Sequence, residues 1–347
     1  MPAFWRKKQF WGAIIGIALL GFCVKDIKVS ELTALLDRVN WYYLIPAILS
    51  SFLFIALKGV RWRLMISRQR QDKLTRSVTL YSAGQVLNIV MPALTGQVGR
   101  VILFSRKQDL RKTFVFSTIL LEILFDAISL IAFMLVTSFA FVFPEEYRFL
   151  SWIVASTTLL ALAALYVLLH YRQNLENVAY RRLRSRWPGV YIAVKKFIRS
   201  FTKGCELLKS SQHMFGTISL SLAFWTAHMM AVWFLMLSFG FQLPFAAAAA
   251  VMIINTIVLM VPITPGNAGT FEIAVSASLA AFAVGRSDAV LFALALHLLD
   301  LLPMFTLGSW FFHLEKVSIR ELKERHAERD IFDQIDEEGT FIEEEQV

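Results

Sequence analysis

The sequence predicts an all-α polytopic membrane protein with six full spans and two re-entrant hairpins, arranged as an inverted repeat. Three observations support this fold class. The 347 residues are 57% hydrophobic and only 18% charged, which excludes an ordinary soluble protein of this length. Several apolar runs are long enough to cross the hydrocarbon core of a bilayer. A Pro-x3-Gly-x2-Gly cluster also occurs twice within apolar sequence, at an offset of 170 residues.

The apolar runs give the positions of the full spans. The first run follows three basic residues and is not followed by a small-x-small cleavage site, so we expect a retained span rather than a signal peptide. The expected spans are residues 10–24, 41–60, 113–142, 149–170, 213–240 and 288–313.

The distribution of Lys and Arg predicts the orientation of these spans. The loop 171–209 carries ten basic and two acidic residues, so we place it in the cytoplasm together with both termini. This orientation is consistent only if residues 77–104 enter and leave the membrane on the cytoplasmic side. Residues 77–104 are therefore predicted to form a re-entrant hairpin, and residues 244–284, which hold the second cluster, to form another.

The two clusters predict an internal repeat. The unit of span, hairpin and span covers residues 41–142 and again 213–313. The single crossing 149–170 separates the units, so they have opposite orientations and their hairpin tips approach the midplane from opposite faces. Broken-helix transporters bind substrate at such a place. The alternative is coincidence, because Pro and Gly are common in membrane helices.

The hairpin backbones are defined by helix breakers and amide side chains. Each break frees backbone groups that must find partners within the lipid. The residues that mark the breaks are Asn88, Pro92, Gly96 and Gly99 in the first hairpin, and Asn255, Pro262, Pro265, Gly266 and Gly269 in the second.

Charged residues within the membrane are candidate functional groups, because burying charge in lipid is costly. Three alternatives remain open. Arg100 could form a structural pair with one of the carboxylates, the carboxylates could exchange protons, or Arg100 and backbone N–H groups could hold an anionic head group. Arg61 is expected at the cytoplasmic border as an anchor or a contact to lipid phosphate. We expect His297 to be hydrogen-bonded rather than to bind metal. The candidates are Arg61, Arg100, Glu122, Asp126, Glu272, His297 and Asp300.

Outside the spans, the sequence predicts two cytoplasmic segments. Residues 190–208 form a basic amphipathic stretch that either lies on the anionic leaflet or only fixes topology. Residues 314–347 follow the integral domain 1–313 as an acidic tail, which we expect to be disordered. Cys23 and Cys205 lack metal-ligand spacing, so no metal, disulfide or cofactor is expected.

Four motifs give the chain its resemblance to a known family. It resembles the lysylphosphatidylglycerol synthase transmembrane-region family, also described as flippase-like or uncharacterised-0104 proteins. Two departures are Gln97, where the family usually has Glu, and Ile123, where a basic residue often stands; together they suggest a lost ion pair. The motifs are Lys58-Gly-Val-Arg61-Trp62, Asn88-Ile-Val-Met-Pro92-x3-Gly96-Gln-x2-Arg100, Glu122-x3-Asp126 and Pro262-Ile-Thr-Pro265-Gly266-x2-Gly269-x2-Glu272.

The resemblance implies a membrane protein that moves lipids between leaflets or accompanies lipid and glycan assembly. We expect a flippase for a phosphate-bearing phospholipid or polyprenyl-type lipid in a bacterial inner membrane. Its partners would be membrane lipids, and possibly a cytoplasmic lipid- or glycan-synthesis enzyme, but no nucleic acid. Alternatives are a non-transporting accessory and, less favoured, a membrane glycosyl or aminoacyl transferase. Because only residues 314–347 follow the last predicted span, we expect no synthase activity and no enzyme.

Overall fold

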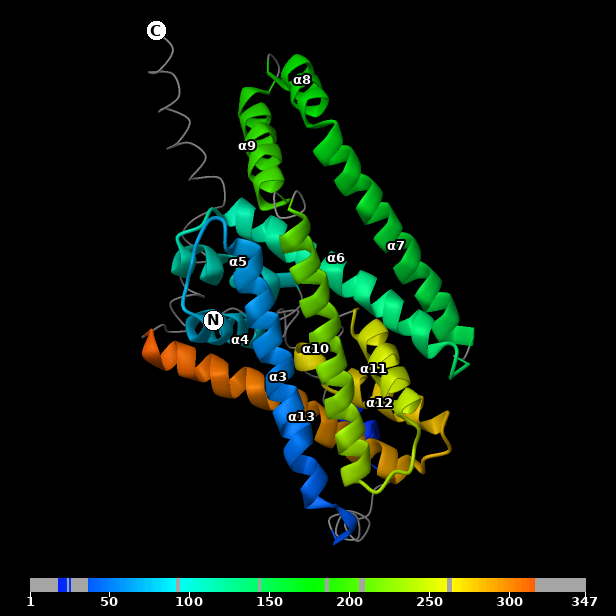
Figure 1. Cartoon of the computed structure of the whole chain (residues 1–347). Helices are drawn as coiled ribbons and strands as arrows, with labels where there is room; N and C mark the ends of the chain where they lie inside the picture. Colours follow the sequence, from blue (N-terminus) through cyan, green and yellow to red (C-terminus); the bar gives the residue numbers. More distant parts are fainter. Residues whose placement is uncertain are drawn as a thin grey trace, which may run out of the picture.

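Helices and their connections form all of the chain that the computed structural model describes (Figure 1). The described residues are 18–23, 25, 37–91, 94–142, 145–184, 187–205, 210–260 and 264–315. The principal helices within them are α3 (Trp41–Ile66), α4 (Leu74–Val90), α5 (Leu94–Gln108), α6 (Lys112–Thr137), α7 (Glu145–His170), α8 (Arg172–Leu183), α9 (Pro188–Gly204), α10 (Ser211–Ser238), α11 (Phe245–Leu259), the 3₁₀ turn η3 (Pro265–Asn267), α12 (Thr270–Ala280) and α13 (Arg286–Leu314).

Four helices are long and apolar enough to cross a membrane. They are α3, α6, α10 and α13, with 26 to 29 residues each, and they confirm an all-helical membrane protein. The predicted span 149–170 falls within α7, where the apolar stretch Trp152–Val167 is shorter. Most of the predicted span 10–24 lies outside the described residues. Six full spans therefore remain a prediction.

The helices are interrupted where the Pro and Gly clusters predict. We call α4 and α5 the first broken pair, because α4 ends at Val90 and α5 begins at Leu94. The second broken pair is α11, η3 and α12, with α11 ending at Leu259 and α12 beginning at Thr270. Pro92 and Pro262 both lie outside the described residues.

The two halves of the chain repeat the same order of elements in opposite directions. Each half has a long helix, a broken pair and a second long helix, and α10 begins 170 residues after α3. The equivalent helices α3 and α10 pack antiparallel. The Asn40 N–H before α3 donates to the Ser238 carbonyl at the end of α10, at 2.7 Å. At the other end, Gly216 of α10 packs on the Leu64 side chain. An inverted repeat requires this antiparallel arrangement.

Both ends of the first broken pair lie together. Arg76, in the first turn of α4, donates from Nη2 to the Lys107 carbonyl near the end of α5, at 3.1 Å. Its Nε donates to Glu315, just beyond α13, at 2.9 Å, and Lys107 Nζ lies 3.0 Å from the same carboxylate. We call Arg76, Lys107 and Glu315 the Arg76 cluster. It closes the pair into a hairpin and fixes the end of α13 beside it.

The ends of the second broken pair meet at the other end of α13. The connection between α10 and α11 carries Phe239 and Phe241, and both rings pack on Phe292 near the start of α13, with centroids 5.3 and 5.6 Å away. Only residues 281–285 join α12 to α13. From Phe292 to Glu315, α13 extends for roughly 35 Å, close to the ~30 Å thickness of a bilayer core. The open ends of the two broken pairs are therefore about one bilayer apart.

Helix α11 is enclosed by protein. Nine consecutive residues, Ala247–Asn255, are buried, so every side of the helix contacts other helices. A helix that is apolar around its whole circumference requires such burial. It packs in the main hydrophobic core with α3, α10, α12 and α13.

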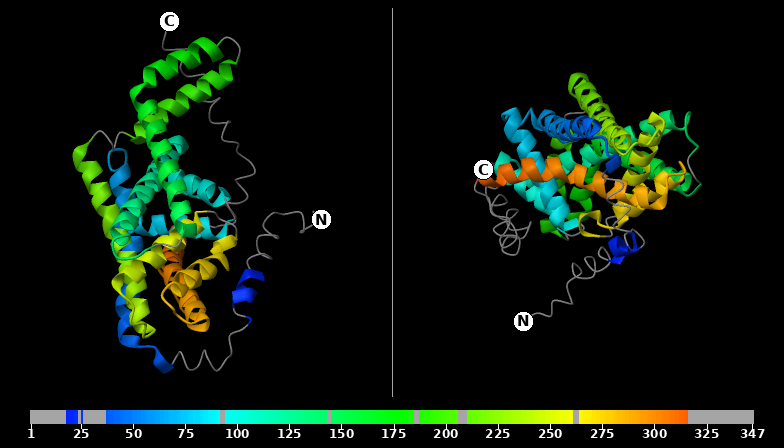
Figure 2. Two further views of the ribbon diagram at one scale, coloured as in Figure 1. Left: turned by 90° about the vertical axis from the view of Figure 1, so that its right-hand side faces the viewer. Right: turned by 90° about the horizontal axis from the view of Figure 1, so that it is seen from below.

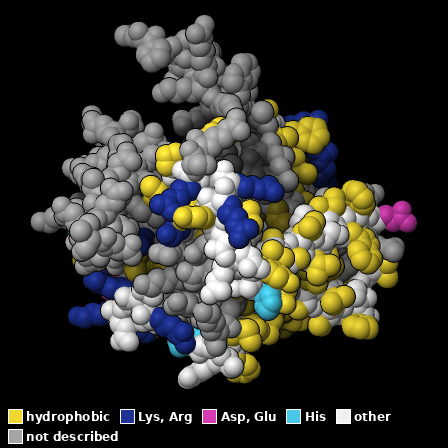
Figure 3. Space-filling view, turned by 90° about the horizontal axis from the view of Figure 1, so that it is seen from above, with side chains coloured by type: hydrophobic (Ala, Val, Ile, Leu, Met, Phe, Trp, Pro, Cys, Tyr) yellow, Lys and Arg dark blue, Asp and Glu magenta, His cyan; other side chains and the backbone are white. Residues whose placement is uncertain are grey.

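Helices α8 and α9 extend beyond the bundle (Figure 2). Seen from that end, Lys and Arg side chains gather beside hydrophobic ones (Figure 3), as the basic loop 171–209 predicts. The predicted amphipathic stretch corresponds to α9. Its Ile198 and Phe201 are buried, and Gly204 lies against Ser117 of α6, whereas Phe197 is 39% exposed. The end of α9 therefore packs on the bundle.

Candidate functional site

A cluster of charged side chains is buried between α3, α5 and α6. We call Lys58, Arg61, Arg100, Glu122 and Asp126 the charged cluster. Arg61, Arg100 and Glu122 are 1%, 3% and 4% exposed. The sequence brings them together because Lys58 and Arg61 are neighbours on α3, and Glu122 and Asp126 lie one turn apart on α6. Arg100 reaches the cluster from α5, about two turns before that helix ends.

Glu122 is the centre of the cluster. Its Oε2 accepts a hydrogen bond from Arg100 Nη2 at 2.5 Å, and its Oε1 accepts one from the Tyr81 hydroxyl at 2.5 Å. Arg61 Nη2 lies 3.6 Å from Oε1. The predicted pairing of Arg100 with a carboxylate of α6 is therefore confirmed. The attraction within such a pair offsets part of the free energy needed to remove both charges from water. Removing one member alone is costly, because it leaves the other charge buried without a partner.

Asp126 forms the more open side of the cluster. Arg61 Nη1 donates to its Oδ1 at 2.5 Å and also to the Ser221 hydroxyl on α10 at 2.8 Å. Lys58 Nζ lies 3.5 Å from Oδ2, and the Asp126 side chain is 21% exposed. Arg61, expected as a border anchor or a contact to lipid phosphate, is instead buried, and Asp126 of α6 and Ser221 of α10 bind its guanidinium. Trp62, the next residue of the same motif, is also 1% exposed.

The charged cluster has an excess of cations and of hydrogen-bond donors. Three cations face two carboxylates. Three buried donor atoms also lack a hydrogen-bond acceptor: Arg61 Nη2, Arg100 Nε and Trp62 Nε1. Buried polar atoms without partners are uncommon in folded proteins and point to a strained or ligand-binding place. One further negative charge would balance the three cations of the cluster.

A second polar group lies at the break between α11 and α12. Glu272 Oε2 accepts a hydrogen bond from the Gly269 N–H at 2.7 Å and caps α12. Its Oε1 lies 2.7 Å from His297 Nδ1 of α13, and His297 Nε2 lies 3.1 Å from the Gly266 carbonyl. The Phe271 ring stacks on His297 at 4.3 Å. As a hydrogen-bonded histidine, His297 therefore connects α13 to the turn η3 within the break and to α12 after it.

Asp300 pairs with a residue that sequence reasoning missed. His228 Nε2 of α10 lies 3.1 Å from Asp300 Oδ1, and the Phe54 ring stacks on the imidazole at 4.7 Å. His297, one turn earlier on α13, turns instead to Glu272. The repeat offset could have identified His228, because it stands 170 residues after Lys58.

The two breaks lie against each other. A Cβ atom built on Gly266 of η3 would lie 3.5 Å from Ile89 Cγ2, near the end of α4. Gly266 has φ 62° and Gly269 has φ 83°, and both angles favour glycine at this chain reversal. In the first pair, a Cβ on Gly96 would lie 2.7 Å from Asn88 Cα, so α4 and α5 can approach only because residue 96 is glycine.

The remaining predicted backbone residues lie around the same breaks. A Cβ on Gly99 would be 2.9 Å from Met91 Sδ, so this glycine also permits close packing of the first pair. Pro265 opens η3. Asn255 is 4% exposed, and its Oδ1 is buried without a hydrogen-bond donor.

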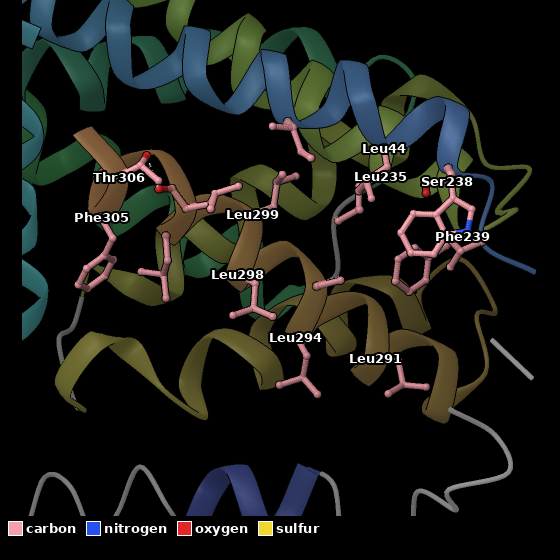
Figure 4. Close-up of a pocket in the computed structure, with 16 residues that line it drawn as sticks. Leu44, Leu235, Ser238, Phe239, Leu291, Leu294, Leu298, Leu299, Phe305 and Thr306 are labelled. Atoms are coloured by element: carbon pink, nitrogen blue, oxygen red, sulfur yellow. Dashed lines mark hydrogen bonds between the residues drawn. The ribbon is translucent and has the colours of Figure 1, made fainter. Parts of the chain in front are cut away.

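Two apolar cavities open beside the bundle. The first has a volume of about 730 Å³ and lies between α3, α10 and α13. Figure 4 shows Leu44, Leu235 and Leu298 among its lining side chains, with Ser238 near one end and Thr306 near the other. The second has a volume of about 530 Å³ and is lined by α6, α7 and α9, with Met260 at the end of α11. Both resemble places for hydrocarbon chains rather than for polar ligands.

Ile123 and Gln97, the two departures noted in the sequence, lie in different surroundings. Ile123 is 52% exposed and lines the second cavity, whereas Gln97 Oε1 is buried without a donor. The lost ion pair stays a prediction.

Comparisons with known proteins identify the family of the chain. A UPF0104 membrane protein of Pyrococcus horikoshii is 22% identical over 302 residues, covering 82% of this chain and 90% of that protein. One of Methanocaldococcus jannaschii is 23% identical over 300 residues, covering 81% and 86%. No solved structure matches. The sequence profile named Lysylphosphatidylglycerol synthase TM region matches residues 9–308. The chain therefore belongs to the lysylphosphatidylglycerol synthase TM region family.

Proposed function

We propose that this membrane protein moves a phosphate-bearing lipid between the two leaflets. The observation that carries the proposal is the contact between the breaks at Gly266 and Ile89. In this proposal the two broken pairs are re-entrant hairpins that enter from opposite faces, because their open ends lie about one bilayer apart along α13. A pathway through the protein would then pass the contact, as in transporters with paired broken helices.

The charged cluster is the proposed site for the lipid phosphate. Arg61 and Arg100 present donors without acceptors, and the cluster carries three cations against two carboxylates. A phosphate oxygen is a strong acceptor and brings the missing negative charge. In this proposal Arg100 pairs with Glu122 through Nη2 and binds a phosphate oxygen through Nε, the atom that has no acceptor.

The two apolar cavities are the proposed places for the acyl chains of the lipid. Lipid transport requires that the acyl chains stay in hydrocarbon while the head group crosses the protein. The cavity between α3, α10 and α13 is lined almost wholly by apolar side chains. Two of these, Leu298 and Trp41, are 69% and 63% exposed. Exposed apolar surface of this kind suits acyl chains in a bilayer. We place the protein in the bacterial inner membrane, with the Arg76 cluster and the termini on the cytoplasmic side.

A vesicle assay tests the proposal. Purified protein is reconstituted with a fluorescent phospholipid, and the fraction accessible to an external quencher is followed. We expect faster exposure of inner-leaflet lipid than in protein-free vesicles. Arg100→Gln should slow it, since the cluster then holds two cations against two carboxylates. Arg63→Gln, at an exposed position on the same helix as Arg61, is the matched control. Rates equal to protein-free vesicles for anionic and zwitterionic phospholipids alike would overturn the proposal.

One observation favours the accessory role as a second candidate. Helices α8 and α9 extend beyond the bundle and expose basic side chains, including Arg181, Arg182 and Arg184. Such a surface could receive an acidic cytoplasmic enzyme. Co-purification of an enzyme that is lost when these three arginines are changed to Gln, with no lipid movement in vesicles, would favour this role.

A further inference from the structure

A neutral histidine and an ionised glutamate together carry one proton too few for the contacts around His297. A carbonyl oxygen can only accept, so His297 Nε2 must carry the hydrogen that it donates to the Gly266 carbonyl. The other nitrogen, Nδ1, lies 2.7 Å from Glu272 Oε1. A proton must lie between these two atoms, either on Nδ1 or on the carboxyl group. Without it, two lone pairs would face each other at hydrogen-bond distance.

The other carboxylates of the bundle do not share this requirement. Glu122 and Asp126 face Arg100, Arg61 and Lys58. Arginine does not release its proton under physiological conditions, so the arginine pairs stay charged.

The Asp300 pair differs as well. A neutral His228 that carries its hydrogen on Nε2 already satisfies the contact with Asp300, and His228 Nδ1 has no partner. Of the carboxylate pairs described within the bundle, Glu272 with His297 is thus the one whose geometry depends on an added, exchangeable proton.

We infer that Glu272 and His297 form a proton-binding site that couples lipid movement to proton movement. The inference rests on the proposed function. Loss of the proton would replace an attraction by a repulsion at the contact that joins α13 to the second break. That break carries Gly266, which packs on Ile89 of the first broken pair. Protonation would hold the two breaks together, and release of the proton would separate them.

Charged and titratable groups around Glu272 and His297 come from residues 18–23, α13 and α10. Cys23, from the described helical residues 18–23, lies near enough to interact electrostatically with Glu272, and Arg286 at the start of α13 lies beside Cys23. About one turn further along α13 lies Asp300, with its partner His228 on α10. Helix α11, which packs on α12, carries no charged residue, and α4, which packs on η3, carries Arg76 in its first turn, within the Arg76 cluster. The His297 side chain is 12% exposed, against 2% for Glu272, so the imidazole is the more accessible member.

Glu272→Gln is the decisive variant. The amide nitrogen can donate to Nδ1 of a neutral His297, and the amide oxygen can accept from the Gly269 N–H. All three hydrogen bonds are then kept without an exchangeable proton. His213→Gln, at the half-exposed start of α10, is the control for loss of a histidine elsewhere.

Lipid movement is measured in vesicles with and without an imposed pH gradient. We expect the wild-type and His213→Gln rates to change with the gradient, and the Glu272→Gln rate to be independent of it. If wild type transports lipid but ignores the gradient, or if Glu272→Gln follows it as wild type does, the coupling is overturned and the proposed function stands. If wild type moves no lipid, both fall.

A second readout examines the proton site itself. In protein labelled with ¹⁵N-histidine, we expect the His297 Nδ1 resonance to titrate in wild type and to show a hydrogen-bonded nitrogen at the lower pH. A resonance typical of a free, unprotonated nitrogen throughout the titration would overturn the site.

Discussion

Gly266 packs against Ile89, and this contact joins the two halves of the repeat at their breaks. The residues are 177 positions apart in the sequence, on opposite broken pairs. Because each pair closes at its other end, at the Arg76 cluster and around Phe292 respectively, the contact places both tips inside the bundle.

Gly96→Ala should destabilise the protein. The new Cβ would lie 2.7 Å from Asn88 Cα, a backbone atom that cannot move without shifting α4. Overpacking of this kind costs about 1–3 kcal/mol. The thermal unfolding temperature of detergent-purified protein measures the effect. Gly189→Ala is the matched control, since nothing lies within 4 Å of its Cβ. Equal unfolding temperatures for both variants would contradict the close approach of α4 and α5.

Glu122→Gln should be more damaging than Asp126→Asn. The side chain of Glu122 is 5% exposed and that of Asp126 is 21% exposed. Removing one partner of a fully buried pair costs about 3–5 kcal/mol, because the remaining charge is left unpaired. Water reaches Asp126 and reduces the corresponding loss. Denaturant unfolding followed by tryptophan fluorescence would rank the variants, and the reverse order would show that Glu122 is not the centre of the cluster.

Gln97→Glu should weaken the binding of anionic lipid without unfolding the protein. Residue 97 lies about one turn before Arg100 on α5, so a carboxylate there would add a negative charge on the side of the helix near Arg100 and oppose a bound anion. We expect less anionic phospholipid to co-purify with the variant, as measured by native mass spectrometry. Zwitterionic lipid should change less. An unchanged amount of anionic lipid would argue against the charged cluster as the phosphate site.

The Arg76 cluster should stabilise the protein in a pH-dependent way. Burial alone would raise the pKa of Glu315, but hydrogen bonds from Arg76 and Lys107 outweigh it and hold that pKa below the ordinary value of 4.5. A carboxyl whose pKa is lower in the folded state contributes stability above its unfolded pKa, and this contribution is lost as the pH falls through the folded value. Glu315→Gln should therefore lower the unfolding temperature at pH 7. Its difference from wild type should shrink below a pH of about 4. A constant difference would exclude the carboxylate as the cause.

Cysteine labelling should place the open ends of the two broken pairs on opposite sides of the membrane. In a background with Cys23→Ala and Cys205→Ala, single cysteines replace exposed residues at each end. Gln71→Cys and Arg111→Cys flank the first pair, and Gln242→Cys and Gly285→Cys flank the second. An impermeant maleimide should react with the first two from one side and the last two from the other. Opposite labelling of Gln71→Cys and Arg111→Cys would show that the first pair crosses fully.

Much of this architecture could be predicted from local sequence. Apolar length predicts α3, α6, α10 and α13, and Pro and Gly predict the breaks, because hydropathy and backbone freedom are properties of short segments. The burial of Arg61 and the pairing of Asp300 with His228 could not be predicted in this way. Both depend on which helix packs against α10, and side-chain spacing within one helix says nothing of its neighbours. The span-end position of Arg61 was misleading, since the helix continues to Ile66 inside the protein.

The enclosure of α11 changes how its sequence should be judged. Hydropathy treats residues 245–259 as it would any stretch that touches lipid, yet Ala247–Asn255 are buried among other helices. The effect of a substitution along Ala247–Ala250 should then depend on the volume of the new side chain, as in the interior of a water-soluble enzyme. Exchanging one of these alanines for serine would be a mild change and for leucine a severe one, the reverse of the order that partitioning into oil would give.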